Sequence, residues 1–108
     1  LYFAGERIGL KVAGEVFADR AYTDAGTLVP RGRPGAVIHD HDKLVGHVLR
    51  MLDAGGVVSQ SGKVLPGAMD SICVHGDTLG AVESARQLRV ALEARGWHLQ
   101  TLVEKLGA

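Results

Sequence analysis

Short runs of strand-forming residues alternate with longer amphipathic segments along this chain, and this alternation constrains the fold more than any other feature. Residues 12–18 (V-A-G-E-V-F-A) and 71–75 (S-I-C-V-H) are typical of strands, whereas residues 42–54 and 78–95 have the apolar periodicity of helices. Strands that alternate with helices favour parallel strands with helical connections over an all-helical arrangement. The sequence therefore predicts an α/β fold.

The first long helix is expected to begin at about Asp42. Its apolar residues recur at positions i, i+3, i+4 and i+7, which is one face of an amphipathic helix: Val45, Val48, Leu49 and Leu52. Asp40 or Asp42 can cap the N-terminus with a side-chain oxygen, and Gly55–Gly56 can end the helix.

The second long helix is expected from Thr78 to Arg95. Asp77 or Thr78 can cap it, and Arg95–Gly96 can close it, with the cation at the negative end of the helix dipole. Its expected apolar face consists of Val82, Ala85, Leu88, Ala91 and Leu92.

The other segments are expected to be a helix end, a loop, a hairpin and a last strand. Residues 3–10 suggest the end of a short helix and a turn at Gly9, and residues 19–35, rich in Gly, Pro and Asp, suggest a long loop. Residues 57–66 suggest a hairpin that turns at Ser61–Gly62. Residues 97–102 suggest a final strand before a frayed tail.

Two or three strands make a poor sheet on their own, so the chain is expected to be one segment, residues 1–108, of a larger domain. Its opening, L-Y-F-A-G-E-R-I-G-L, reads like the tail of a helix that has already begun, which suggests that a longer N-terminal part is missing. Free strand edges and an unfilled core face predict self-association as a homo-oligomer if the segment folds alone.

Composition argues against several kinds of partner. The 12 basic and 12 acidic residues give zero net charge with histidine neutral, so no excess positive charge attracts nucleic acid or an acidic membrane. One cysteine cannot form an internal disulfide, which fits a reducing cytoplasm. Neither a signal-peptide pattern nor a bilayer-length apolar run is present, so a cytoplasmic protein without a membrane partner is expected.

Polar residues follow both predicted strands, at the position where ligands bind in parallel α/β folds. Asp19–Arg20 follow the first strand, and His75-Gly76-Asp77 follow the second. His75 can act as a base, an acid or a hydrogen-bond donor near pH 7, Asp77 can orient it, and Gly76 lets a ligand approach the backbone. The same residues also fit a plain turn capped by Asp77 and a surface ion pair between Asp19 and Arg20.

Other candidate motifs are better explained by structural roles or lack a required residue. The run His39–Asp42 (H-D-H-D) resembles a metal site, but neighbouring side chains diverge, so helix entry explains it better. Cys73 is expected to be a small buried apolar residue, and His47 a residue on the flank of its helix. Gly62 and Gly67 have the spacing of a phosphate-binding loop, but Ala68-Met69 replaces the required Lys-Ser or Lys-Thr.

Three motifs in order resemble the C-terminal part of the LamB/YcsF family, which supplies the A subunit of 5-oxoprolinase. They are E-V-F-A-D-R-A-Y, G-T-L-V-P-R-G-R-P-G-A-V-I and S-I-C-V-H-G-D, and the resemblance extends from about Gly5 to about Gly96. It implies part of a distorted β/α barrel like that of polysaccharide deacetylases. Family members are about twice as long, and their N-terminal motifs are absent here, so this segment alone is expected to be inactive.

The resemblance also implies ATP-dependent hydrolysis of 5-oxoproline (pyroglutamate) to L-glutamate with two other subunits. ATP, with Mg²⁺, is expected on a partner subunit. On this hypothesis His75 is the base or acid and Asp77 orients it or the water, while Arg20, positioned by Asp19, binds the substrate carboxylate or a phosphate. Other candidates for the pocket are Glu15, Tyr22, Arg31 and Gly76.

Two other functions fit the same residues. A metal-dependent deacetylase of the same fold would act on a sugar or an amide and use His75 as a ligand. A non-catalytic subunit would bind 5-oxoproline for its partners. Metal content separates the first of these from a 5-oxoprolinase, and binding without turnover identifies the second.

Overall fold

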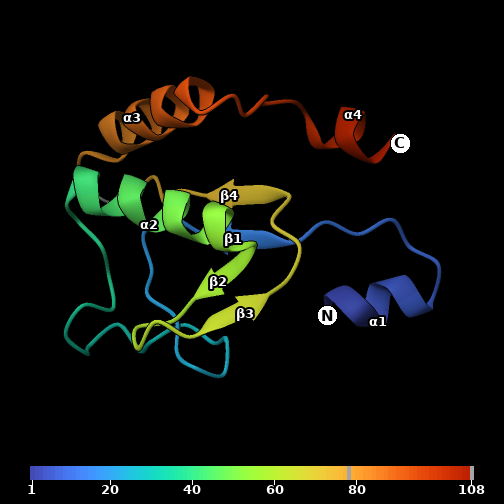
Figure 1. The fold of residues 1–108 in the computed structure, drawn as a ribbon, viewed down its shortest axis with the longest axis horizontal. Helices are drawn as coiled ribbons and strands as arrows, with labels where there is room; N and C mark the ends of the chain where they lie inside the picture. Colours follow the sequence, from blue (N-terminus) through green and yellow to red (C-terminus); the bar gives the residue numbers. More distant parts are fainter. Residues whose placement is uncertain (78, 108) are drawn as a thin grey trace.

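The computed structural model of the protein describes residues 1–77 and 79–107. Figure 1 shows two long helices on one side of short strands, with both chain ends at the opposite end of the molecule. No helix in these two ranges is long and apolar enough to cross a membrane. The elements are α1 (Tyr2–Arg7), β1 (Glu15–Phe17), α2 (His41–Ala54), β2 (Gly56–Val58), β3 (Val64–Pro66), β4 (Ser71–Cys73), α3 (Ala81–Ala94) and α4 (Leu102–Leu106).

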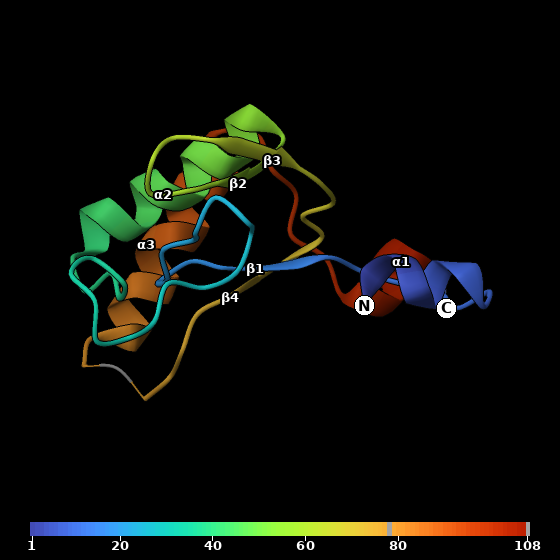
Figure 2. The ribbon, with the colours of Figure 1, turned by 90° about the horizontal axis from the view of Figure 1, so that it is seen from below.

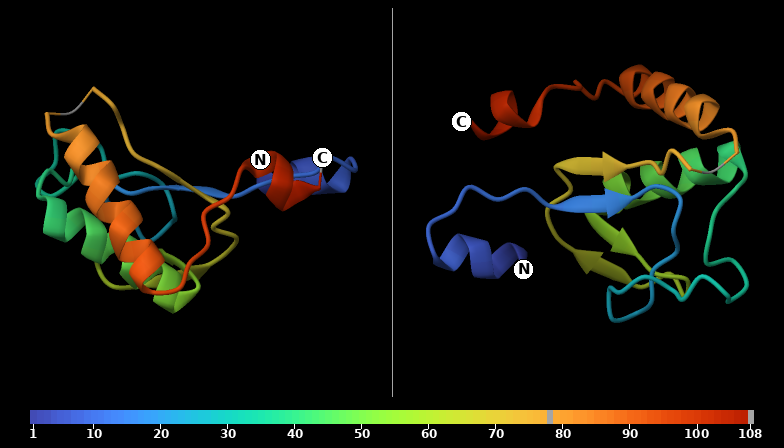
Figure 3. Two further views of the ribbon diagram at one scale, coloured as in Figure 1. Left: turned by 90° about the horizontal axis from the view of Figure 1, so that it is seen from above. Right: turned by 180° about the vertical axis from the view of Figure 1, so that it is seen from behind.

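The strands form two small sheets, as Figure 3 shows from behind. β1 and β4 are parallel, with Glu15 opposite Ser71, Val16 opposite Ile72 and Phe17 opposite Cys73. This confirms the parallel α/β prediction, although both strands are shorter than expected. β2 and β3 form the predicted antiparallel hairpin, whose turn contains Gly62 at a φ of 90°.

α2 begins and ends as the sequence predicts. The Asp40 side chain accepts a hydrogen bond from the Lys43 amide at 3.0 Å, and Gly55 ends the helix in the left-handed conformation, with a φ of 75°. Because glycine has no Cβ, it adopts this conformation without steric strain. The apolar face of α2 is thereby held over the parallel sheet.

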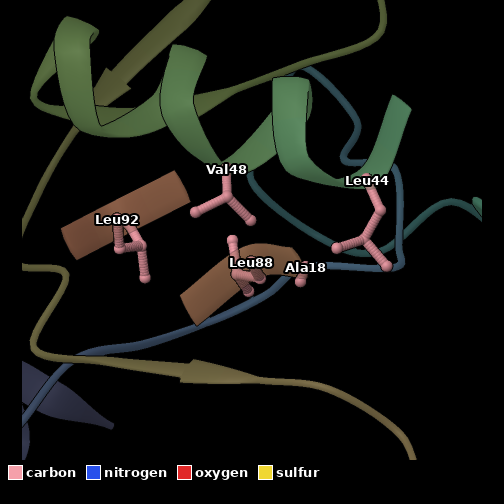
Figure 4. Packing of buried hydrophobic residues seen from close by; sticks show 5 residues of the cluster. All are labelled: Ala18, Leu44, Val48, Leu88 and Leu92. Atoms are coloured by element: carbon pink, nitrogen blue, oxygen red, sulfur yellow. The ribbon is translucent and has the colours of Figure 1, made fainter. Parts of the chain in front are cut away.

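Two buried clusters hold the helices against one face of this sheet. Figure 4 shows the first, in which the side chains of α2 and α3 meet the end of β1. The second joins β1, α2 and β2 around Met51, which is fully buried. The buried members of the first are Ala18, Leu44, Val48, Leu88 and Leu92, and those of the second are Val16, Tyr22, Met51 and Val58.

α3 starts later than predicted. Its N-cap is Gly80, at a φ of 80°, so Asp77 does not cap the helix, and the alternative cap, Thr78, lies outside the described residues. Val82 is 86% exposed, whereas the sequence analysis placed it on the packed face. The buried residues of α3 are four positions apart: Ser84, Leu88 and Leu92. The buried face is this narrow because α3 packs mainly on α2.

The prediction of a final strand at residues 97–102, followed by a frayed tail, is wrong. Residues 97–101 have no strand partner among the described residues, and residues 102–106 form α4 rather than a frayed tail. A capping box explains this helix: Thr101 accepts from the Glu104 amide, and the Glu104 carboxylate accepts from the Thr101 amide. The Lys11 ammonium donates to the Gly107 carbonyl at 3.0 Å, and Figure 2 shows both termini at the same end of the molecule.

Residues 19–38 form an ordered loop that extends three residues beyond the predicted loop of residues 19–35. Single antiparallel bridges join Arg20 to Val37 and Tyr22 to Leu28. A small buried cluster of Ala21, Val29 and Ala36 fills its centre. The loop therefore holds the residues that follow β1 in fixed positions.

Candidate active site

One face of the parallel sheet carries polar side chains and is turned away from both long helices. Val16, Ala18, Ile72 and Val74 pack into the clusters beneath α2 and α3. Successive side chains of a strand point to opposite faces, so the odd-numbered residues of β1 and β4 point away from the helices. In the rear view of Figure 3 both strands lie in front of α2. We call this face, with Glu15, Phe17, Asp19, Ser71, Cys73 and His75, the open face.

The parallel register places Asp19 beside His75 on the open face. Nδ1 of His75 lies 2.8 Å from Oδ1 and 2.9 Å from Oδ2 of Asp19. Asp19 is only 4% exposed, whereas the His75 side chain keeps 29% of its surface accessible. Nδ1 donates its proton to the carboxylate, which leaves Nε2 with a lone pair and access to a ligand.

This pair has the geometry of an oriented general base. A buried carboxylate fixes the tautomer and the ring orientation of the imidazole, and it stabilises the imidazolium that forms when Nε2 takes a proton. Nε2 lies 4.0 Å from Sγ of Cys73, within reach of a weak hydrogen bond from the thiol, so this nitrogen is directed along the open face toward the centre of the strands. The site can remove a proton from a water molecule or from a bound ligand.

The pairing differs from the predicted roles of the four catalytic candidates. From the sequence, Asp77 was expected to orient His75 and Asp19 to position Arg20. In the structure Asp19 orients His75, because both occupy equivalent positions of parallel strands, while Asp77 is exposed in the turn after β4. Arg20 follows Asp19 directly and therefore points to the other side of the chain.

Arg20 is held inside the 19–38 loop. Its Nη2 donates to the Val29 carbonyl at 2.9 Å, and its own carbonyl accepts a hydrogen bond from Nε2 of His47 at 3.0 Å. The residue is 7% exposed, its Nε has no partner among the described residues, and none of the ion pairs within those residues involves it. The predicted anion-binding role of Arg20 stays a prediction, supported by this free N–H group.

Two hollows of the structure lie away from the Asp19–His75 pair. The larger one, about 840 Å³, lies on the core side of β4, between that strand, α3 and residues 97–105. The other, about 800 Å³, lies along α2 and residues 35–39. Neither of these two hollows is lined by Arg20 or His75. Hydrogen-bond geometry, rather than a hollow, identifies the site.

The remaining candidates are dispersed. Glu15 accepts a 2.7 Å hydrogen bond from the Ser71 hydroxyl at the far end of the open face. Tyr22 is buried, and its hydroxyl accepts from the Phe17 amide at 2.8 Å; burial raises the pKa of this phenol. Arg31 is exposed in the loop, and Gly76 follows His75 directly.

Cys73 is half-buried between the two polar ends of the open face. Burial raises the pKa of its thiol, and the nearby charges of Glu15 and Asp19 raise it further. Because a thiolate rather than a thiol is the nucleophile, these surroundings favour the neutral thiol of Cys73 and slow its reactions. The sequence analysis likewise treated Cys73 as an apolar residue rather than as a nucleophile.

The residues of the H-D-H-D run diverge, as their spacing suggested. Asp40 caps α2, and Nδ1 of His41 lies 2.6 Å from the Ser84 hydroxyl of α3. Within residues 1–77 and 79–107, no three His, Cys, Asp or Glu side chains come close enough to hold a metal ion.

His47 has a larger structural role than the sequence analysis gave it. It is 8% exposed, and burial lowers the pKa of its imidazole, as does the nearby Arg50, while the Arg20 carbonyl acts in the opposite direction. The unfolded chain then binds a proton at a higher pH than the folded chain. As the pH falls below about 6.5, the folded state is expected to lose stability until the pH passes the lower pKa of folded His47.

Replacement of His47 by glutamine tests this prediction. Gln keeps an N–H donor for the Arg20 carbonyl but does not titrate, so the difference in free energy of unfolding between wild type and variant is expected to change between pH 7.5 and pH 5. Urea unfolding at several pH values measures it, with exposed His98→Gln as the control. A difference that is constant across this pH range would contradict the prediction.

Sequence reasoning missed the Asp19–His75 pairing and the position of Phe17 beside it. The rings of Phe17 and His75 have centroids 5.3 Å apart. Both features follow from the two-residue alternation along each strand, which the sequence does show. The alignment of one strand with the other, by contrast, is set by long-range packing.

Comparisons with known proteins identify relatives of this chain. Residues 1–107 match the LamB/YcsF family. The 5-oxoprolinase A subunit of Azoarcus sp. is 65% identical over 104 residues, which cover 96% of this chain and 41% of the relative. The 5-oxoprolinase A subunit of Nitrobacter hamburgensis is 54% identical over 96 residues, 89% of this chain and 38% of the relative.

A solved structure is also similar. The lactam utilization protein of Thermus thermophilus superposes with a TM-score of 0.76 at 36% identity, over 88% of this chain and 37% of that protein. The chain thus spans about two fifths of the length of the relatives that it matches. The family match over nearly every residue and the agreement in fold lead to one conclusion: the chain belongs to the LamB/YcsF family.

Proposed function

We propose that this chain supplies the general base of an ATP-dependent 5-oxoprolinase, which hydrolyses 5-oxoproline to L-glutamate. Relatives at up to 65% identity are named as the A subunit of 5-oxoprolinase, and a similar structure is called a lactam utilization protein. The single observation that carries the proposal is the 2.8 Å contact between Nδ1 of His75 and the buried Asp19 carboxylate.

The chemistry of a lactam explains why such a base is needed. Amide resonance protects the carbonyl carbon, and the ring nitrogen is a poor leaving group. Transfer of the γ-phosphoryl group of ATP to the lactam oxygen makes the ring carbon electrophilic. Nε2 of His75 then takes a proton from a water molecule as its oxygen attacks that carbon. The ring C–N bond breaks as the nitrogen is protonated, which leaves an acyl phosphate, and a second water molecule hydrolyses this to glutamate and phosphate.

We place ATP on a partner subunit. Gly62 and Gly67 have the spacing of a phosphate-binding loop, but they lie in and after the β2–β3 hairpin rather than before a helix. The relatives are named as one lettered subunit of an enzyme, which supports an assembly with other subunits; we take these to be two. Arg20 stays the proposed contact for the substrate carboxylate or a phosphate, but this role would require its side chain to turn from the Val29 carbonyl toward the open face.

We also propose that the parallel strands belong to a β/α barrel in the whole protein, which would act in the cytoplasm. The open face would then be part of the barrel interior, because helices cover only the opposite face of these strands. This arrangement would bring residues from the rest of the polypeptide toward Nε2 of His75.

Reconstitution with the partner subunits tests the function. The natural polypeptide that carries this sequence is expected to form equal amounts of glutamate and ADP from 5-oxoproline and ATP. Metal analysis of the purified protein and a calorimetric titration with 5-oxoproline accompany the assay. Metal-dependent release of acetate would instead indicate a deacetylase, and binding of 5-oxoproline with turnover unaffected by substitution of His75 would indicate a non-catalytic subunit.

A further inference from the structure

Phe17 is a large apolar residue outside the buried core. It lies on the open face, half-buried, and it belongs to none of the three buried clusters that hold the described residues together. The side chains on either side of it along β1, Val16 and Ala18, are both in those clusters. An aromatic side chain outside the core and beside a catalytic group indicates ligand contact.

The open face has a polar–apolar–polar pattern across the two strands. Glu15 bonds Ser71 at one end, and Asp19 bonds His75 at the other. Phe17 lies opposite Cys73 in the middle, between the two polar pairs, because side chains on one face recur every two residues. The neutral thiol of Cys73 extends the apolar surface of the Phe17 ring.

The free nitrogen of His75 is directed toward this apolar middle. Nδ1 is bonded to Asp19, Nε2 lies 4.0 Å from Cys73 Sγ, and the Phe17 ring is tilted by 59° to the imidazole. A ligand at Nε2 therefore contacts Phe17 and Cys73 as well. Such a ligand needs one polar edge for the base and one apolar edge for this surface.

We propose that Phe17 determines specificity for the substrate ring, with its side chain and Cys73 forming the surface on which the ring methylenes lie. A five-membered lactam has the required shape: its N–C=O edge faces the base, and its two methylene carbons form the opposite edge. The inference rests on the proposed function and extends it to the choice of ring size. One methylene group in an apolar site changes selectivity by about 10-fold or more.

The test compares Phe17→Leu with Phe3→Leu in the natural polypeptide with its partner subunits. Phe3 is 68% exposed on α1, so its replacement controls for loss of a phenyl ring far from the site. Phe17→Leu is expected to raise KM for 5-oxoproline about 10-fold with kcat changed less than 3-fold. It is also expected to shift selectivity toward the six-membered homologue, 6-oxopiperidine-2-carboxylate, by about 10-fold. Unchanged KM and selectivity would overturn the inference.

A second measurement does not depend on turnover or on any variant. In the wild-type protein, 5-oxoproline is expected to slow alkylation of Cys73 by iodoacetamide at least 3-fold, as measured by mass spectrometry of the peptide that contains Cys73. Equal alkylation with and without saturating 5-oxoproline would overturn the proposed contact. If His75→Ala abolishes turnover but Phe17→Leu changes neither KM nor selectivity, only the present inference fails; if His75→Ala leaves turnover intact, the proposed function fails.

Discussion

Replacement of His75 by alanine is expected to lower kcat for 5-oxoproline hydrolysis by at least about 100-fold. General base catalysis contributes about 10²- to 10⁴-fold, and within the described residues the Asp19–His75 pair is the only histidine–carboxylate contact within 4 Å. Single-turnover formation of glutamate by the protein with its partner subunits measures the effect. KM is expected to change little, because the base acts mainly on the attacking water.

His98→Ala is the matched control, because His98 is exposed and lines only the hollow beside α3. Asp19→Asn is expected to lower kcat by a similar factor. A neutral amide cannot stabilise the imidazolium, and its N–H group can donate to Nδ1 and so favour the wrong tautomer. A kcat within 3-fold of wild type for both His75→Ala and Asp19→Asn would show that His75 is not the general base.

The elements of the fold were predictable wherever the local pattern agrees with the packing. α2 has a strong apolar period, an aspartate cap and a glycine stop, and all three are found in the structure. The β2–β3 hairpin likewise follows from its turn residues. Local propensity is reliable in these segments because nothing in the tertiary structure opposes it.

Prediction failed where two local signals compete. Residues 97–102 are apolar enough for a strand, but the Thr101–Glu104 capping box starts a helix there, and no neighbouring strand among the described residues offers a partner. In α3, Val82 has the right spacing for the core but is exposed, because α3 crosses α2 and only part of its face is covered. Contacts of this kind depend on how elements pack, which one sequence does not specify.

For the same reason, the positions of the site residues could be predicted from the sequence, but their pairing could not. Asp19 and His75 were both expected at strand ends, which local sequence indicates. Their partnership depends on the register of β1 against β4, and a shift of one residue would place Arg20 beside His75 instead. The alignment of the two strands therefore determines which residues form the site. It holds Asp19 opposite His75 and directs Arg20 into the loop.

Replacement of Gly56 by alanine is expected to reduce the free energy of unfolding by about 3 kcal/mol, a large effect for one methyl group. A Cβ at this position would lie 2.3 Å from the Leu65 carbonyl oxygen and 2.7 Å from Cα of Pro66, and backbone atoms of a paired strand cannot move aside cheaply. The sequence analysis placed Gly56 in a helix stop. In the structure Gly55 has that role, and Gly56 permits close pairing of β2 with β3.

Gly46→Ala is the matched control for this prediction, because it adds the same methyl group to the same helix–strand unit. A Cβ at Gly46 meets no atom within 4 Å, and the residue lies inside α2, where alanine is expected to stabilise the folded state by about 0.5–1 kcal/mol. The midpoints of urea unfolding are therefore expected to move in opposite directions for the two variants, with unchanged slopes. Equal midpoints would show that β2 and β3 are not packed this closely. The packing also matters for the site, because the Gln60 amide, just beyond β2, donates to the Tyr22 carbonyl in the loop that holds Asp19 and Arg20. With equal midpoints, the anchoring of this loop would need another explanation.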